Sequence, residues 1–192
     1  ASSAPPPQGS IQAPNGRCYL RSTIMPFRSD ETRELRPSLD MKLESVRTLA
    51  QIICSFLNTW QVCTIFYGIT SDGLVRGVKL SYRDRDTVRL GIDSATRMLR
   101  PCLIPKSLAV NFVPVLRSTQ DVYEAASHFV VEILVYGVAR TVYTIKGICY
   151  LRECSQSYEG ISQDVRAWIA KLEETCCLHA QEPLPIETSQ LP

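Results

Sequence analysis

The most regular pattern of apolar and polar positions lies in the stretch that leads up to Asn58. Five apolar side chains there follow the i, i+3, i+4, i+7 spacing of one helix face: Val46, Leu49, Ala50, Ile53 and Leu57. This spacing predicts an amphipathic helix. We expect the polar pair Asn58 and Thr59 to end it.

A short strand and a tight turn are expected directly after this helix. The run from residue 62 to residue 69 is mostly apolar and dense in β-branched and aromatic residues, and its length suits a buried strand. Asp72 and Gly73 follow, and this residue pair is typical of a tight hairpin turn. The segment therefore predicts a helix that leads into a hairpin.

A second amphipathic helix is predicted further along, by four apolar residues that share a face: Val88, Ile92, Ala95 and Leu99. Asp84 and Asp86 are the candidate N-caps, because a side-chain carboxylate can accept from the free N–H groups at a helix start. Arg100 and Pro101 are expected to stop the helix, since proline disfavours helical backbone in the residue before it.

Three more strands and a last helix complete the predicted elements. The strands are expected at residues 108–116, 129–136 and 141–151. Ser162 is the predicted cap of a helix with one apolar face: Val165, Trp168, Ile169 and Leu172. Together these elements predict an α+β fold, in which about three helices pack on a mixed β-sheet.

Composition indicates one domain with flexible ends. The chain has 192 residues, 45% of them hydrophobic, which is enough to bury a full core. Residues 1–16 are rich in proline and poor in apolar side chains, so we expect a disordered leader. We expect residues 17–176 to form the domain and residues 177–192 to form a flexible tail.

Short motifs stand in a fixed order around the first predicted strand. They are Glu34-Leu35-Arg36, Asn58-Thr59, Gly68-Ile69, Asp72-Gly73, Gly77-Val78 and, well downstream, Tyr150-Leu151-Arg152. In this order they resemble the AlbA-type (AlbA_2) nucleic-acid-binding domain of Schlafen and Schlafen-like proteins. The resemblance spans about residues 19–174, and it implies a single Schlafen-like domain.

Cysteine usage changes the picture little. Eight cysteines in a secreted protein would suggest disulfides, but no secretion signal is present, so we expect reduced thiols. Zinc sites need four ligands, commonly in close pairs. We do not expect a zinc site, because the nearest approach to that pattern is a scattered set: Cys149, Cys154, Cys176, Cys177 and His179.

Hydropathy argues against a membrane span in these residues, because no apolar run approaches the necessary length. The N-terminal residues also lack the charged and apolar regions of a signal peptide. We expect a soluble, cytoplasmic protein that makes no membrane contact through this segment. A membrane anchor outside these residues stays an open alternative.

Positive charge is concentrated in the first hundred residues, although the net charge is only +2. A basic cluster around the predicted turn and second helix is suited to neutralise RNA phosphates, and Tyr82 is placed to stack on a base. Arg97 and Arg100 extend this cluster. The alternative is a solvated helix face whose aspartates pair with neighbouring arginines. The predicted RNA-binding residues are Arg36, Arg76, Lys79, Arg83, Arg85 and Arg89.

The resemblance also implies a metal-dependent ribonuclease site. Schlafen-type ribonucleases hold a divalent cation with two glutamates and an aspartate, the hard oxygen ligands that Mg²⁺ and Mn²⁺ prefer. Glu34 occupies the place of the second glutamate and is the predicted metal ligand. Ser29 and Thr70 stand at the other two places, so this chain departs from the family's ligand set.

Nearby carboxylates offer substitutes for the missing ligands. Alternation along a strand places Asp30 on the same face as Glu34, whereas Glu31 needs a bulge to reach that face. Asp72 is also the residue that a turn before Gly73 demands. The candidate catalytic residues are Glu34, Glu31 and Asp72, with Mg²⁺ or Mn²⁺ as the candidate cofactor.

The resemblance and the incomplete ligand set together predict a subunit of an RNA-processing endoribonuclease assembly. The nematode complex that trims piRNA precursors, built from several distinct Schlafen-like chains, is an example of such a system. We expect this chain to contribute RNA binding, architecture and one carboxylate, that of Glu34, to a shared metal-dependent site. Nuclease activity is expected only in complex with other Schlafen-like subunits, which are, with RNA, the expected partners.

Two alternatives remain open. A stand-alone metal-dependent endoribonuclease would need Glu34, Asp30 or Glu31, and Asp72 to gather around one ion. A non-catalytic protein-interaction scaffold would have Glu34 paired with an arginine and would not bind RNA. Nucleotide enzymes and hydrolase triads are excluded, because the chain has no glycine-rich phosphate loop and its two histidines lack a nucleophile at a recognisable spacing.

Overall fold

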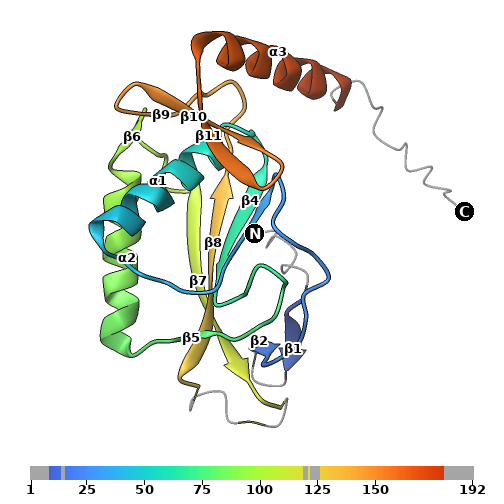
Figure 1. Cartoon of the computed structure of the whole chain (residues 1–192), viewed down its shortest axis with the longest axis vertical. Helices are drawn as coiled ribbons and strands as arrows, with labels where there is room; N and C mark the ends of the chain where they lie inside the picture. The colour runs from blue at the N-terminus through green and yellow to red at the C-terminus, as the bar shows by residue number, and fades with distance from the viewer. Residues whose placement is uncertain (1–8, 14–15, 119–120, 122–125, 180–192) are drawn as a thin grey trace, which may run out of the picture.

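The computed structural model describes residues 9–13, 16–118, 121 and 126–179, and these residues adopt the α+β fold that the sequence predicts (Figure 1). Two helices, α1 (Leu43–Leu57) and α2 (Tyr82–Thr96), lie on one face of a mixed sheet. A third helix, α3 (Ser162–His179), projects from one end of the molecule. Within the described ranges, no helix is long and apolar enough to cross a membrane.

The larger sheet has seven strands in the order β1-β2-β7-β8-β4-β3, and β5 also pairs with β8. The β2–β7 and β3–β4 pairs are parallel, and the other pairs are antiparallel. The strands span Ile11–Ala13 (β1), Gly16–Leu20 (β2), Arg33–Arg36 (β3), Val62–Tyr67 (β4), Val78–Lys79 (β5), Leu108–Leu116 (β7) and His128–Tyr136 (β8).

The main core lies between the two helices and the sheet. All five residues that predicted the first helix face are buried there, and they join inward residues of β4 and β8 such as Ile65 and Ile133. From α2, Val88, Ile92 and Ala95 complete this cluster. Full burial of an aliphatic side chain stabilises the fold by about 1.5–3 kcal/mol, so the apolar periodicity was a sound guide to the buried faces of both helices. The predicted end of the second helix was wrong: α2 ends at Thr96, before the predicted stop at Arg100, and Leu99 is buried in a short strand, β6 (Leu99–Arg100), instead.

A smaller sheet of four strands, in the order β11-β10-β9-β6, packs near the C-terminal end of α1. Its strands span Leu99–Arg100 (β6), Thr144–Ile145 (β9), Ile148–Glu153 (β10) and Gln156–Gly160 (β11). The single strand predicted at residues 141–151 is therefore wrong. Lys146 and Gly147 adopt left-handed backbone angles, with φ of 50° and 81°, and this turn divides the run into a hairpin.

The predicted ends of the domain need correction where the structure describes them. Residues 11–13, which we assigned to the disordered leader, form β1 and pair with β2. Residues 177–179, which we assigned to the tail, continue α3. Apolar side chains are too few in either segment to predict these elements. Of the other leader and tail residues, the structure describes Gly9, Ser10 and Gly16, and the remaining ones lie outside the described part.

The motif glycines Gly68 and Gly77 are explained by the close approach of two backbone segments. Both adopt positive φ, and the Gly68 carbonyl accepts hydrogen bonds from the N–H groups of Arg76 and Gly77, at 3.0 and 2.8 Å. A Cβ atom on Gly68 would lie 2.9 Å from the Gly77 Cα. The turn at Asp72 and Gly73 forms as predicted. After the turn, one bridge joins Val75 to Ile69, just past the end of β4, and the chain then pairs with β8 through β5.

The N-cap of α2 is Ser81, so the prediction of Asp84 or Asp86 was wrong. The Ser81 hydroxyl accepts from the Asp84 N–H at 3.2 Å, and the Asp84 carboxylate accepts from the Ser81 N–H at 2.8 Å. This reciprocal pair is a capping box, which satisfies two free donors at once. Asp84 is the third residue after the N-cap rather than the cap itself.

Replacing Ser81 by alanine is expected to lower the free energy of unfolding by about 1 kcal/mol, because one half of the capping box is lost. Urea unfolding followed by far-UV circular dichroism measures this change. Ser94→Ala is the matched control, since Ser94 is an exposed residue inside the same helix, where alanine is favourable. Equal effects of the two changes would contradict the capping role.

Candidate functional site

Glu34, the predicted metal ligand, lies on β3 and is 7% exposed. Strand alternation turns Glu34 and Arg36 toward the helices, while Leu35 joins the apolar cluster on the opposite face. One carboxylate oxygen, Oε2, accepts from the Arg152 Nη2 at 2.7 Å. The other, Oε1, lies 2.8 Å from the Arg36 Nε. Both oxygens of Glu34 are therefore engaged by arginines.

Arg152, on β10, is the main partner of Glu34 and is itself 1% exposed. Its guanidinium donates to the Asp30 carbonyl at 2.9 Å, to the Arg33 carbonyl at 3.2 Å and to the Ser157 hydroxyl at 3.3 Å. Its carbon atom Cζ lies 4.8 Å from the centre of the Phe56 ring. Arg152 thus links the smaller sheet to β3 and to α1.

The other predicted carboxylates have different local roles. The Asp30 carboxylate accepts from the N–H groups of Thr32 and Arg33 and from the Arg33 side chain, so it closes the turn before β3. Burial opposes the charged form of Asp30, but these hydrogen bonds outweigh it and lower the pKa of the carboxyl. Glu31 is exposed. None of these contacts directs Asp30 or Glu31 toward the Glu34 oxygens.

Ser29 and Thr70, which stand at the family's other two ligand positions, also form local hydrogen bonds. The Ser29 hydroxyl accepts from the Leu35 N–H at 2.9 Å. The Thr70 hydroxyl donates to the exposed Asp72 carboxylate, and this bond lowers the pKa of the Asp72 carboxyl. Asp72 is a turn residue, as its neighbour Gly73 suggested.

These contacts do not fit a Mg²⁺ or Mn²⁺ site. Such ions require several free oxygen ligands around one point. Glu34 instead neutralises a buried arginine, and Ser29 and Asp72 face their own turns. Among residues 9–13, 16–118, 121 and 126–179, no three His, Cys, Asp or Glu side chains lie where they could share a metal ion, so Glu34, Glu31 and Asp72 are not gathered into one.

The cysteines considered for zinc are dispersed in the part of the chain that the structure describes. Cys149 is buried in β10, where burial raises the pKa of its thiol and the Asn58 amide donates to its sulfur at 3.4 Å. Cys154 and Cys176 are exposed. The side chains of Cys177 and His179 lie outside the described residues.

A second buried carboxylate was not singled out from the sequence. Glu132, in the middle of β8, is fully buried and accepts from the Tyr19 hydroxyl at 2.6 Å, and it forms an ion pair with Arg17. Burial, followed by the charge of Glu132, raises the pKa of Tyr19. Arg17 and Tyr19 lie on β2, more than a hundred residues before Glu132, so no spacing in the sequence reveals this network.

The predicted RNA-binding residues divide into two groups. Arg36 pairs with Glu34; the Arg85 guanidinium lies over the rings of Tyr82 and Phe129, at 4.3 and 4.9 Å; and Arg89 pairs with Asp86 at 2.9 Å. These three side chains have intramolecular partners, and the Arg89–Asp86 pair is of the kind that the solvated-face alternative supposed. The other three come from the residues before β5, from β5 and from the first turn of α2: Arg76, Lys79 and Arg83.

Three residues that the sequence did not single out extend this second group. His128 lies opposite Lys79 in the β5–β8 ladder. Burial lowers the pKa of His128, and the positive charges of Arg21, Lys79 and Arg117 lower it further. Arg21, Arg117 and His128 also line a cavity of about 420 Å³, together with Asp121, whose carboxylate accepts from the backbone N–H groups of Arg117 and Ser118. We call the set Arg21, Arg76, Lys79, Arg83, Arg117 and His128 the basic end.

The basic cluster that the sequence suggested is not one surface. Arg97 and Arg100 follow the last turn of α2, whereas Arg83 lies in its first turn and Lys79 in β5, just before the helix. A helix of 15 residues separates its two ends by roughly 20 Å. Arg97 and Arg100 therefore belong to a different part of the molecule from the basic end.

Comparison with known protein families identifies one match that covers most of the chain. Residues 23–147 match the family described as the Schlafen-like domain of nematodes. This range includes β3, α1, β4, α2, β7 and β8, and it ends just before the strand that contains Arg152.

Comparison with solved structures gives a more distant likeness. A crystal structure of the DIP2311 protein from Corynebacterium diphtheriae is 14% identical, with a TM-score of 0.48. The likeness covers 72% of this chain and 23% of that protein, so this chain spans about a quarter of the bacterial protein's length.

Proposed function

The chain belongs to the Schlafen-like domain family of nematodes, and on that premise we propose that it is a subunit of an RNA-processing endoribonuclease assembly, to which it contributes RNA binding and architecture. Its partners are RNA and other Schlafen-like chains, as in an assembly that trims piRNA precursors. The cleavage chemistry then resides on those partner chains.

The main support for a non-catalytic role is the engagement of Glu34 by Arg152 and Arg36. A metal ion that took the Glu34 carboxylate would leave the Arg152 guanidinium buried without its counter-charge, at a cost of several kcal/mol. The same contacts disfavour a stand-alone nuclease. They also favour a role in which Glu34 stabilises the subunit rather than a shared active site.

The basic end supports RNA binding. Three cations, Arg21 after β2, Lys79 of β5 and Arg117 after β7, converge on His128, although they are far apart in the sequence. Arg83 adds a fourth in the first turn of α2. Tyr82, in the first turn of α2, is 82% exposed. Arg85 lies over one face of its ring, and the other face is accessible for stacking on a base. Convergent cations with an accessible aromatic ring suit the phosphates and unpaired bases of single-stranded RNA.

Charge reversal at the basic end is expected to weaken RNA binding. In Lys79→Glu/Arg83→Glu, the affinity for a labelled single-stranded RNA should fall about ten- to a hundredfold, and the dependence of affinity on salt should become shallower by about two lost phosphate contacts. Fluorescence anisotropy titrations at several salt concentrations measure both quantities.

The matched control for this experiment is Lys106→Glu/Arg166→Glu. These two residues are exposed and outside the basic end, and the double change alters the net charge by the same amount. Its affinity should stay within about twofold of the wild type. Equal losses in both variants, or no RNA binding by the wild-type chain, would remove the RNA-binding half of the proposal.

Cleavage assays test the catalytic half. A labelled structured RNA is incubated with Mg²⁺ or Mn²⁺ and either the chain alone or the chain with its co-purifying partners. Cleavage is expected only with the partners, and Glu34→Gln/Arg152→Met, which removes both buried charges together, should retain it. Cleavage by the chain alone would support a stand-alone nuclease, whereas loss of activity in a folded double variant would place Glu34 in a shared active site.

A further inference from the structure

A groove between α1 and α2 is not explained by the RNA interface. It consists of two adjoining cavities of about 610 and 390 Å³ that share Leu43 and Met98. Its apolar part includes Leu43 and Leu90, which are 61% and 66% exposed, together with Met41 and Met98. Leu43 and Leu90 line the same cavity from α1 and α2, and exposed apolar side chains grouped in this way mark interaction surfaces.

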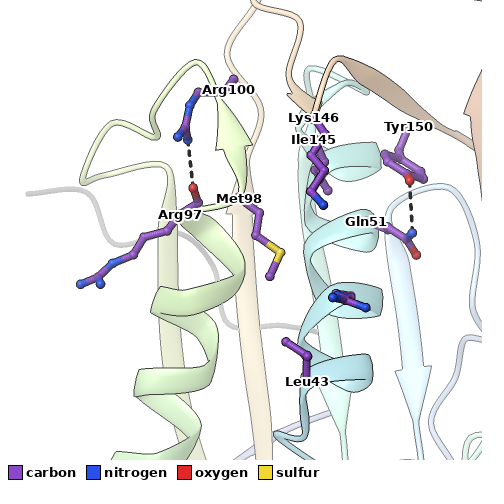
Figure 2. A pocket seen from close by; sticks show the side chains of 9 residues that line it. Leu43, Gln51, Arg97, Met98, Arg100, Ile145, Lys146 and Tyr150 are labelled. Atoms are coloured by element: carbon purple, nitrogen blue, oxygen red, sulfur yellow. Dashed lines mark hydrogen bonds between the residues drawn. The ribbon is translucent and has the colours of Figure 1, made fainter.

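The other part of the groove is strongly cationic. Four basic residues line the larger cavity, and no Asp or Glu is among the described residues that line either cavity. They come from α1, from the segment after α2 and from the turn after β9: Arg47, Arg97, Arg100 and Lys146. In Figure 2, Met98 projects into the space between the two helices, and Ile145 and Lys146 lie above Leu43.

We propose that this groove binds an acidic amphipathic segment of a partner protein. Aliphatic side chains of the segment contact Leu43, Leu90 and the two methionines, and its carboxylates face the basic side chains of the larger cavity, chiefly Arg47 and Lys146. Methionine side chains adapt to differently shaped apolar partners, which suits a peptide-binding surface. Charge complementarity fixes the class of partner, because an uncompensated cluster of four cations repels a basic segment.

A nucleotide is a poorer occupant of the groove. Bases are commonly held by stacking on exposed aromatic rings. The aromatic residue that lines the groove, Tyr150, is 7% exposed, and its hydroxyl accepts from the Gln51 amide at 3.2 Å and donates to Glu159 at 3.1 Å. Its ring is therefore unavailable, and the exposed apolar surface is aliphatic.

The larger cavity of the groove lies at the opposite end of α2 from the basic end, and the smaller cavity extends along the helix as far as Thr87. The groove and the basic end share no residue, so the two sites can be tested separately. Docking of a partner chain rests on the proposed role as a subunit. It does not depend on RNA binding, because none of the groove residues belongs to the basic end. A failure of either site therefore leaves the other measurable.

Selection from a phage-displayed library of 16-residue peptides on the purified chain tests the proposal. Enriched peptides are expected to combine aliphatic residues at i, i+3, i+4 and i+7 with several Asp or Glu residues. A synthetic enriched peptide should bind the wild type in anisotropy titrations, and Arg47→Glu/Lys146→Glu should weaken it at least about tenfold. Leu90→Ser, which removes an exposed apolar contact, should also weaken it.

Two matched variants show whether the loss of peptide affinity is specific to the groove. Lys79→Glu/Arg83→Glu and Lys106→Glu/Arg166→Glu make the same change in charge away from the groove and should leave peptide affinity within about twofold. Thermal unfolding of every variant verifies that it is folded. No enrichment of acidic peptides, or binding that the groove variants do not weaken, would overturn the proposal. A loss of RNA affinity in Arg47→Glu/Lys146→Glu as large as in Lys79→Glu/Arg83→Glu would assign the groove to RNA instead.

Discussion

Replacing Arg152 by alanine is expected to lower the free energy of unfolding by about 3–5 kcal/mol, because the buried Glu34 carboxylate loses its main counter-charge. The change also removes the hydrogen bonds to the Asp30 and Arg33 carbonyls and to the Ser157 hydroxyl. Since a domain is stable by only about 5–15 kcal/mol, this variant should be close to unfolding at 25 °C. Urea unfolding monitored by circular dichroism measures the loss.

Two comparisons test whether the loss arises from the unpaired charge. Arg166→Ala removes an exposed arginine of α3 and should change stability by no more than about 0.5 kcal/mol. Glu34→Gln/Arg152→Met removes both charges and should be more stable than Arg152→Ala, because no unpaired carboxylate remains in the interior. A double variant as unstable as Arg152→Ala would mean that the hydrogen bonds of Arg152, rather than its charge, dominate.

Replacing Asn58 by alanine should lower the free energy of unfolding by about 3 kcal/mol, because several buried hydrogen bonds are lost together. Asn58 is 1% exposed and follows the last turn of α1. Its amide donates to the carbonyls of Tyr143 and Tyr150 at 3.0 and 2.9 Å, and its oxygen accepts from the Tyr143 N–H at 2.7 Å. One side chain thus joins α1 to β10 and to the residue before β9.

Tryptophan fluorescence is a suitable measurement for this variant. The indole of Trp168 donates to the Asn58 carbonyl at 2.9 Å, and that of Trp60 donates to the Thr141 carbonyl at 3.0 Å, so both report on this region. Gln61→Ala is the matched control, since Gln61 is exposed and only three residues away. A shift of the unfolding midpoint no larger than in Gln61→Ala would show that the fold does not depend on the Asn58 contacts.

Much of the secondary structure was predictable because its signals are local. The periodicity that ends at Leu57 predicted α1 to its last residue, and the strand predicted at 108–116 coincides with β7. The capping box was also visible as Ser81 followed three residues later by Asp84, although the prediction placed the cap at the acidic residue. The hairpin of β9 and β10 was missed because its turn uses Lys146 in a left-handed conformation, which composition alone does not indicate.

The candidate site was harder to predict because its decisive contacts are distant in the sequence. Position and motif singled out Glu34, but its partner Arg152 lies 118 residues further along. Similarly, the arginines between residues 76 and 100 look like one cluster in the sequence. The length of α2 separates Arg83 at the basic end from Arg97 and Arg100, which line the groove.

The sequence by itself determined the helices, the central strands, the α+β class and the resemblance to Schlafen-like domains, since apolar periodicity and short motifs act over a few residues. Only the tertiary structure decided what each charge does. The same type of carboxylate side chain can bind a metal ion, cap a turn or neutralise a buried arginine. Which role it has depends on which groups the fold brings within about 3 Å. For Glu34 the neighbouring group is the Arg152 guanidinium on β10, and no local sequence pattern near Glu34 specifies this contact.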